Sequence, residues 1–115
     1  MKTVYVAGAY SDVNPDNIKA NIATARIFTV KLWNNGFGVL CPHLNSAGME
    51  IDSTAPYETY TAFYLRMIPH CDMLFMLPNW HSSDGARNEL NLATKLNIPV
   101  YFDINRLLNE QKESK

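Results

Sequence analysis

The sequence predicts an α/β protein, an open parallel sheet of four to five strands with helices on both faces. Short, almost wholly apolar segments alternate with stretches of helical spacing, which is typical of a parallel sheet that is buried on both faces. A chain of 115 residues has room for one such sheet. We therefore expect residues 1–115 to form a single domain.

Each predicted element has its own local signal. The strands are short apolar runs bounded by turn-forming or polar residues: Thr3 to Ala7, Phe37 to Cys41, Asp72 to Leu77 and Ile98 to Phe102. The helices have apolar residues at helical spacing: Pro15 to Gly36 with Asn14 as N-cap, Tyr57 to Met67, Ala86 to Leu96, and a last helix from Arg106 to Glu110. His43 to Pro56 and Pro78 to Gly85 are predicted loops, Pro99 indicates an edge strand, and Gln111 to Lys115 is expected to fray.

Composition and charge exclude several classes of protein. With 47% hydrophobic and 18% charged residues, the chain can build a packed core, which excludes intrinsic disorder. A net charge of −1 without a run of lysine and arginine argues against nucleic acid polymers and anionic membranes as partners. Met1-Lys2-Thr3 leads into a strand rather than a signal peptide, and Cys41 and Cys71 match no disulfide framework. We expect a cytoplasmic protein.

The predicted topology places ligand-binding segments at one edge of the sheet. In open parallel sheets, ligands bind beyond the carboxyl ends of the strands, where the strand order reverses. The segments that follow the predicted strands are Gly8 to Ser11, Pro42 to Ser46, Pro78 to Gly85, and the residues after Phe102. Tyr5 and Tyr10 flank the glycine turn, Tyr10 can stack on a base or bond to a sugar, and His43 can contact a substrate. Asp72 opens its strand and is therefore predicted at the amino end, away from this edge.

Glu89 interrupts the apolar stripe of the predicted helix from Ala86 to Leu96. None of the residues three or four positions away can form an ion pair with it. Because an unpaired buried carboxylate is costly, a functional role for Glu89 is favoured over a structural one.

The segment Ser82-Ser83-Asp84-Gly85 precedes the same helix. Free amides at a helix N-terminus favour an anion such as phosphate, although an ordinary helix cap explains the same residues. Neither G-x-x-x-x-G-K-[ST] nor G-x-G-x-x-G occurs, so the pattern indicates a small phosphate site and no ATP or dinucleotide fingerprint. The cysteines and histidines lack metal-ligand spacing, and no G-x-S-x-G elbow is present. No metal or organic cofactor is expected.

Four motifs occur in one order along the chain: V-Y-V-A-G-A-Y-S at Val4 to Ser11, C-P-H at Cys41 to His43, C-D at Cys71-Asp72 and S-D-G-A-R-N-E at Ser83 to Glu89. Together they resemble the nucleoside 2-deoxyribosyltransferase superfamily over about residues 3 to 102. The resemblance is nearest to its small uncharacterised phage and bacterial members, close to the 2′-deoxynucleoside 5′-phosphate N-hydrolases. It implies a flavodoxin-like, broadly Rossmann-like fold.

The resemblance also implies roles for individual residues. Glu89 matches the glutamate that attacks the anomeric carbon and forms a glycosyl ester, and Asp72 matches an aspartate near the sugar or base. Ser83 stands where the nucleotide hydrolases have serine and the nucleoside transferases have aspartate. In the hydrolases a phosphate-binding serine follows the glycine of the first strand, whereas this chain has Ala9 and Tyr10 there. The contact of that serine with the phosphate is therefore either lost or supplied by Ser11. Members also complete their sites with a residue from a neighbouring subunit, which implies a homo-oligomer with shared active sites.

The expected function is hydrolysis of the N-glycosidic bond of (deoxy)nucleoside 5′-monophosphates. Glu89 is the nucleophile, and the Gly8 to Ser11 turn, Ser83 and Gly85 hold the phosphate. Tyr5 or Tyr10 and His43 position the sugar and base. Two alternatives remain open: a 2-deoxyribosyltransferase that moves the sugar between bases, and a non-catalytic module that binds a nucleotide.

Overall fold

The computed structural model describes residues 1–113 and contains one parallel sheet. Its strands are β1 (Thr3–Ala7), β2 (Gly38–Leu40), β3 (Met73–Met76) and β4 (Val100–Tyr101). Their order is β2-β1-β3-β4, so β4 with its neighbouring Pro99 lies at an edge, as predicted. This is the flavodoxin-like strand order. The point at which the strand order reverses lies between β1 and β3, although the strands themselves are all parallel. The predicted fold class is confirmed, with four strands.

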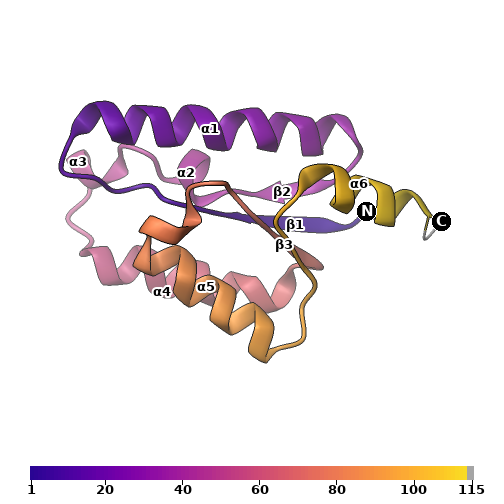
Figure 1. Ribbon diagram of the computed structural model, residues 1–115. Coiled ribbons are helices and arrows are strands. Elements are labelled where there is room, and N and C mark those ends of the chain that lie inside the picture. The colour runs from indigo at the N-terminus through magenta and orange to yellow at the C-terminus, as the bar shows by residue number, and fades with distance from the viewer. Residues whose placement is uncertain (114–115) are drawn as a thin grey trace.

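Helices cover both faces of this sheet. Figure 1 shows α1 (Pro15–Asn34) and α6 (Ile104–Glu113) on one face, and α4 (Tyr57–Met67) and α5 (Asp84–Lys95) on the other. Alternate residues of β1 pack against the helices on the two faces of the sheet, because successive side chains along a strand point to opposite faces. Val4 and Val6 pack in the core beneath α1 and α6, whereas Tyr5 and Ala7 pack in the core shared with α4 and α5.

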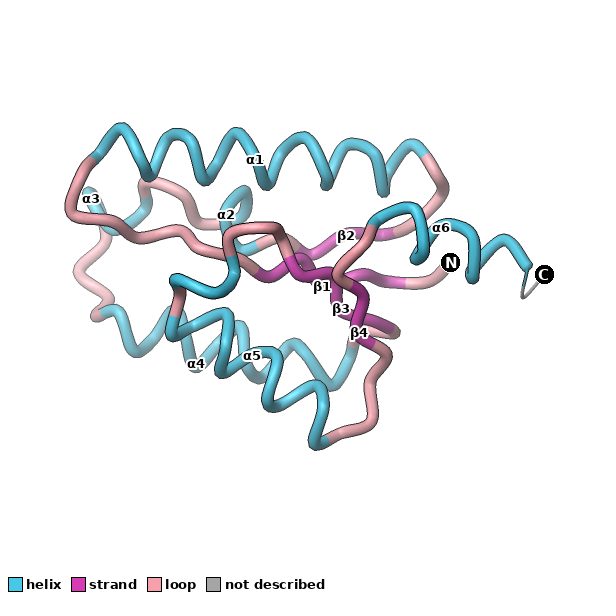
Figure 2. Tube along the Cα trace, in the orientation of Figure 1, coloured by secondary structure: helices cyan, strands magenta, loops and turns pink. Residues whose placement is uncertain are grey.

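Some predicted boundaries are wrong. The segment predicted as a loop from His43 contains two short helices, α2 (Pro42–Asn45) and α3 (Met49–Asp52), and Figure 2 shows both as helical turns. Two 3₁₀ turns, η1 (Ile68–His70) and η2 (Trp80–Ser82), flank β3. Such single turns carry too few residues to show a period, although Pro42 at the first position of α2 is a typical start signal.

The predicted fraying of the C-terminal tail is also wrong for residues 111–113, which continue α6. The side chain of Gln111 accepts a hydrogen bond from Lys2 Nζ at 2.8 Å, which ties the end of the helix to the start of the chain. The last two residues of the predicted tail lie outside the described residues. Along residues 1–113, none of the helices is both long and apolar enough to cross a membrane.

Candidate active site

A cavity of about 720 Å³ lies where the carboxyl ends of β1 and β3 meet. Its walls come from the loop after β1, the α2–α3 segment, α4 and the first half of α5. Three of the four predicted ligand segments therefore contribute to it. The segment after Phe102 supplies none of the lining residues within the described part of the chain.

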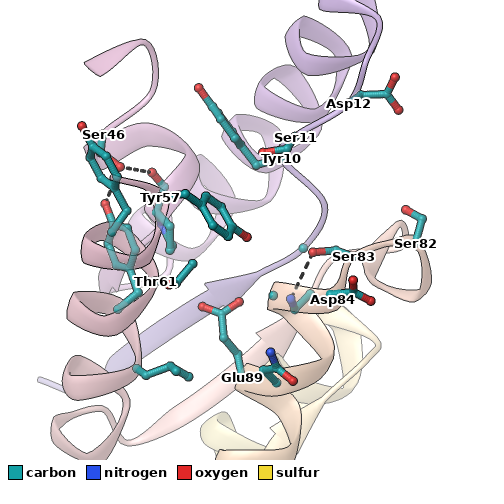
Figure 3. A pocket seen from close by; sticks show the side chains of 18 of the residues that line it. Tyr10, Ser11, Asp12, Ser46, Tyr57, Thr61, Ser82, Ser83, Asp84 and Glu89 are labelled. Carbon is teal, nitrogen blue, oxygen red and sulfur yellow. Dashed lines mark hydrogen bonds between the residues drawn. The ribbon is translucent and has the colours of Figure 1, made fainter. Parts of the chain in front are cut away.

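Glu89 projects from α5 into this cavity (Figure 3). Its Oε2 accepts a hydrogen bond from the hydroxyl of Tyr5, a fully buried residue of β1. Burial raises the pKa of Glu89 to about 7, and the bond from Tyr5 acts in the opposite direction. Burial, followed by the charge of Glu89, raises the pKa of Tyr5 above its usual range, so the tyrosine stays the proton donor of the pair.

No cation neutralises Glu89 within residues 1–113, where the ion pairs are Arg87 with Asp84 and Arg106 with Glu110. The sequence-based expectation of a carboxylate without a local partner therefore agrees with the structure. A partly buried carboxylate with a raised pKa and one free oxygen can act as a nucleophile or as a proton-transfer group.

The N-terminus of α5 borders the cavity beside Glu89. Ser83 is the N-cap, and its Oγ accepts the Ala86 N–H at 3.1 Å. The backbone N–H groups of Asp84 and Gly85 lie in the first turn of α5, where the helix itself provides no acceptor for them. A side chain at Gly85 would lie 3.6 Å from the hydroxyl of Tyr57, which reaches across from α4. Figure 3 shows Tyr57 between the two helices. This end of the cavity can therefore donate hydrogen bonds to a small anion.

The loop after β1 forms another wall and is held by partly buried side-chain amides. Gly8 lines the cavity, but its lack of a side chain has a packing cause, since a Cβ there would lie 2.6 Å from Leu77 Cδ1. The Ala9 N–H donates to Asn79 Oδ1 at 3.0 Å, and Asn79 Nδ2 donates to Asn21 Oδ1 at 3.0 Å. Asn21 in turn donates to the carbonyl of Tyr10.

His43 and Ala9 do not reach the cavity, contrary to the prediction that they contact a substrate. His43 is 2% exposed, and its Nε2 donates to the Ala9 carbonyl at 2.7 Å. Burial lowers the pKa of His43, so it is neutral at this position. The physical role of this pair is to join α2 to the loop after β1.

Tyr10 and Ser11 line the cavity as predicted. The Tyr10 hydroxyl donates to Glu50 Oε1 at 2.7 Å and accepts the Gly48 N–H at 3.1 Å, which connects the loop after β1 to α3. Tyr5, which was predicted to contact the substrate, is not among the lining residues, and its hydroxyl bonds to the carboxylate of Glu89.

Asp72 lies at the opposite edge of the sheet. Its Oδ2 accepts the N–H of Thr3, the first residue of β1, at 2.7 Å, and its own N–H donates to the Thr3 carbonyl. The strand pattern predicted this amino-end position, whereas the family resemblance implied a place near the sugar or base. The structure does not bring Asp72 to Glu89, and we assign it no part in the reaction.

Sequence reasoning missed several residues around the cavity. Tyr57, Tyr60 and Tyr64 line it from one face of α4, and Tyr64 bonds to Ser46 Oγ at 2.6 Å. Their spacing of three and four residues was a readable signal for one helix face. Asn79 lies in a predicted ligand segment, but its contacts with the loop after β1 depend on tertiary structure that no local pattern encodes.

Comparisons with known proteins agree with this architecture. The family model described as Domain of unknown function (DUF4406) matches residues 2–102. The chain belongs to this family. No curated protein matches the DUF4406 chain. A solved structure described as 2-deoxyribosyltransferase from the psychrotolerant bacterium Bacillus psychrosaccharolyticus matches with a TM-score of 0.65 at 19% identity, over 93% of this chain and 90% of that chain. The predicted resemblance to the nucleoside 2-deoxyribosyltransferase superfamily is thus confirmed at the level of the fold.

Proposed function

We propose that this DUF4406 protein cleaves the N-glycosidic bond of a nucleoside or nucleoside 5′-monophosphate, with Glu89 as the nucleophile. The observation that carries the proposal is the Glu89 carboxylate, which projects into the cavity with a hydroxyl on one oxygen and no cation beside it. The shared fold with a 2-deoxyribosyltransferase supports this class of chemistry.

The proposed reaction uses both oxygens of that carboxylate. Tyr5 holds Oε2, so Oε1 is free to attack the anomeric carbon. The bond to the base breaks, its electron pair leaves with the ring nitrogen, and a glycosyl ester forms on Glu89. Water then attacks the same carbon in a hydrolase, whereas a second base does so in a transferase, and Glu89 leaves as a carboxylate again.

The 5′-monophosphate is the expected form of the substrate. The Ser83 hydroxyl and the amides of Asp84 and Gly85 supply donors for a phosphate at the N-terminus of α5. We expect Ser83→Ala to raise the KM for a deoxynucleoside 5′-monophosphate and to leave the KM for the matching deoxynucleoside nearly unchanged. An equal effect on both substrates would contradict a phosphate at Ser83.

A chromatographic assay of free base tests the reaction itself. The purified protein is incubated with the four common deoxynucleosides and their 5′-monophosphates, with and without an added second base. We expect release of base, and Glu89→Gln to lower the rate by at least about a thousandfold. Glu58→Gln is the matched control, because Glu58 is exposed on α4 and does not line the cavity.

The outcomes separate the candidate functions. A new nucleoside formed from the added base identifies a transferase, and release of base alone identifies a hydrolase. Tight binding in calorimetry without release of any base would contradict the enzyme and leave the nucleotide-binding module. Full activity of Glu89→Gln would contradict the nucleophile.

A homo-oligomer with shared active sites is part of the proposal. Met49 and Ile51 on α3 and Phe63 on α4 are large apolar side chains that are exposed on elements that form the cavity walls. A second copy that covers them would also border the cavity.

A further inference from the structure

The cavity carries a strongly one-sided charge. Asp12, Glu50, Asp84 and Glu89 all line it. No lysine, arginine or histidine occurs among its lining residues within positions 1–113. Since the whole chain has a net charge of only −1, this excess of acidic residues is a feature of the cavity and not of the chain in general.

Within residues 1–113, two of these acidic residues, Asp12 and Glu50, have no cationic partner. Hydrogen bonds from the Asn14 amide and the Asn17 side chain lower the pKa of Asp12, so it is ionised. Glu50 is held by the Tyr10 hydroxyl, which carries no charge. Arg87 pairs with Asp84 in an exposed position and also donates to the His81 carbonyl, but it does not line the cavity.

Aromatic side chains line the same cavity. Tyr57, Tyr60 and Tyr64 come from α4, and Tyr10 comes from the loop after β1, where its hydroxyl bonds to Glu50. The face of an aromatic ring is negative and attracts cations. Tyrosines in the same cavity as the exposed carboxylate of Glu50, which accepts a hydrogen bond from Tyr10, are therefore suited to a flat, positively charged ring.

We propose that the base in the substrate of this site is a cationic heterocycle, such as a pyridinium or an N-alkylated purine, bound between the tyrosines and Glu50. This inference rests on the proposed function, because it names the group that leaves when Glu89 attacks. It concerns the base alone, so it applies with or without a 5′-phosphate at the N-terminus of α5.

The chemistry of the leaving group agrees with this charge. When the bond to the anomeric carbon breaks, the electron pair neutralises the ring nitrogen of a cationic base, so the base leaves without a proton. A neutral base leaves as an anion unless it is protonated, and the carboxylate of Glu50 opposes an anion in the base position, whereas the amides at the N-terminus of α5 favour an anion in the phosphate position. Glu89 stabilises the positive charge as it moves from the base to the sugar. Glu50 and the tyrosines stabilise the cationic base when the substrate binds.

A binding experiment on Glu89→Gln tests the charge preference without turnover. The probes are nicotinamide riboside, whose ring is cationic, and its reduced form, which has nearly the same shape and a neutral ring. We expect the cationic form to bind about tenfold more tightly in calorimetry. Adding Glu50→Gln, which keeps an oxygen to accept from Tyr10, should remove most of that preference, whereas adding Glu58→Gln should leave it intact.

Two results separate this inference from the proposed function. Equal or tighter binding of the neutral form would overturn the cationic base, and faster release of base from uridine or inosine, which carry the same ribose, than from nicotinamide riboside by the unmodified protein would overturn it too. Both leave the N-glycosidase reaction standing. Conversely, a cationic preference in binding together with no cleavage of any N-glycoside would overturn the reaction and retain the class of ligand.

Discussion

The pair formed by Tyr5 and Glu89 joins the middle strand β1 to the helix α5 through one hydrogen bond between side chains. The tyrosine is fully buried, so the position of its hydroxyl is fixed by the core and not by solvent. A residue of the sheet therefore holds the Glu89 carboxylate in place. Burial raises the pKa of this carboxyl group, and the hydrogen bond from Tyr5 lowers it.

Tyr5→Phe is expected to move the pH dependence of the reaction upward. The bond from Tyr5 lowers the pKa of Glu89, so its loss raises that pKa. Because the nucleophile must be ionised, the rising limb of kcat/KM, expected near pH 7 in the unmodified protein, shifts to higher pH. A profile that falls in height without a shift would show that Tyr5 acts only on packing.

Glu89→Gln is expected to stabilise the fold at alkaline pH. Between about pH 4.5 and pH 7 the folded chain binds more protons at Glu89 than the unfolded chain, so the free energy of unfolding of the unmodified protein falls as pH rises through this window. Glutamine does not ionise. The Tm advantage of the variant should therefore be larger at pH 8 than at pH 5, and a constant difference would contradict the raised pKa.

At the scale of elements, the sequence predicted strands and long helices well and predicted contacts between loops poorly. Gly8 to Ser11 was expected at the ligand edge because a buried strand precedes it, and Gly8, Tyr10 and Ser11 do line the cavity. His43 was expected in the cavity for the same reason, yet it faces the Ala9 carbonyl. Sequence position fixes the edge at which a residue lies, but the direction of its side chain depends on how α2 packs.

Asn79→Ala tests the amide groups that hold the loop after β1. The change leaves the Ala9 N–H and Asn21 Oδ1 without this partner, which should reduce the free energy of unfolding by about 1–3 kcal/mol. We also expect a higher KM, because the loop lines the cavity. Urea unfolding and steady-state kinetics measure the two effects, with Asn109→Ala on the exposed side of α6 as control. An effect on stability alone would show that the loop does not contact substrate.

At the scale of the whole molecule, large apolar side chains remain exposed on several elements. Met49, Ile51 and Phe63 lie on α3 and α4, which form cavity walls, whereas Ile27 and Trp33 lie on α1, which covers one face of the sheet (Figure 1). Periodicity predicted the buried stripes of the helices. It cannot predict which exposed apolar residues a second copy would cover, because that depends on a surface formed by several elements.

Light scattering on two variants tests the shared site. We expect the unmodified protein to be an oligomer and Ile51→Glu to reduce both its mass and its activity, because a charge at an apolar interface opposes association. Ile27→Glu on α1 should change neither. A monomeric unmodified protein, or a loss of mass for Ile27→Glu with full activity, would contradict sites shared across α3 and α4.

The two cavity glycines differ in what surrounds them. A methyl group at Gly8 would overlap Leu77, whereas one at Gly85 would meet only ordinary contacts with Tyr57 and Ser83. In a library of all single substitutions, variants at Gly8 should therefore disappear when cells are selected for soluble protein alone. Variants at Gly85 should survive that selection and disappear only when growth requires the reaction. The order in which the two positions become intolerant would thus separate what the chain needs to fold from what it needs to work.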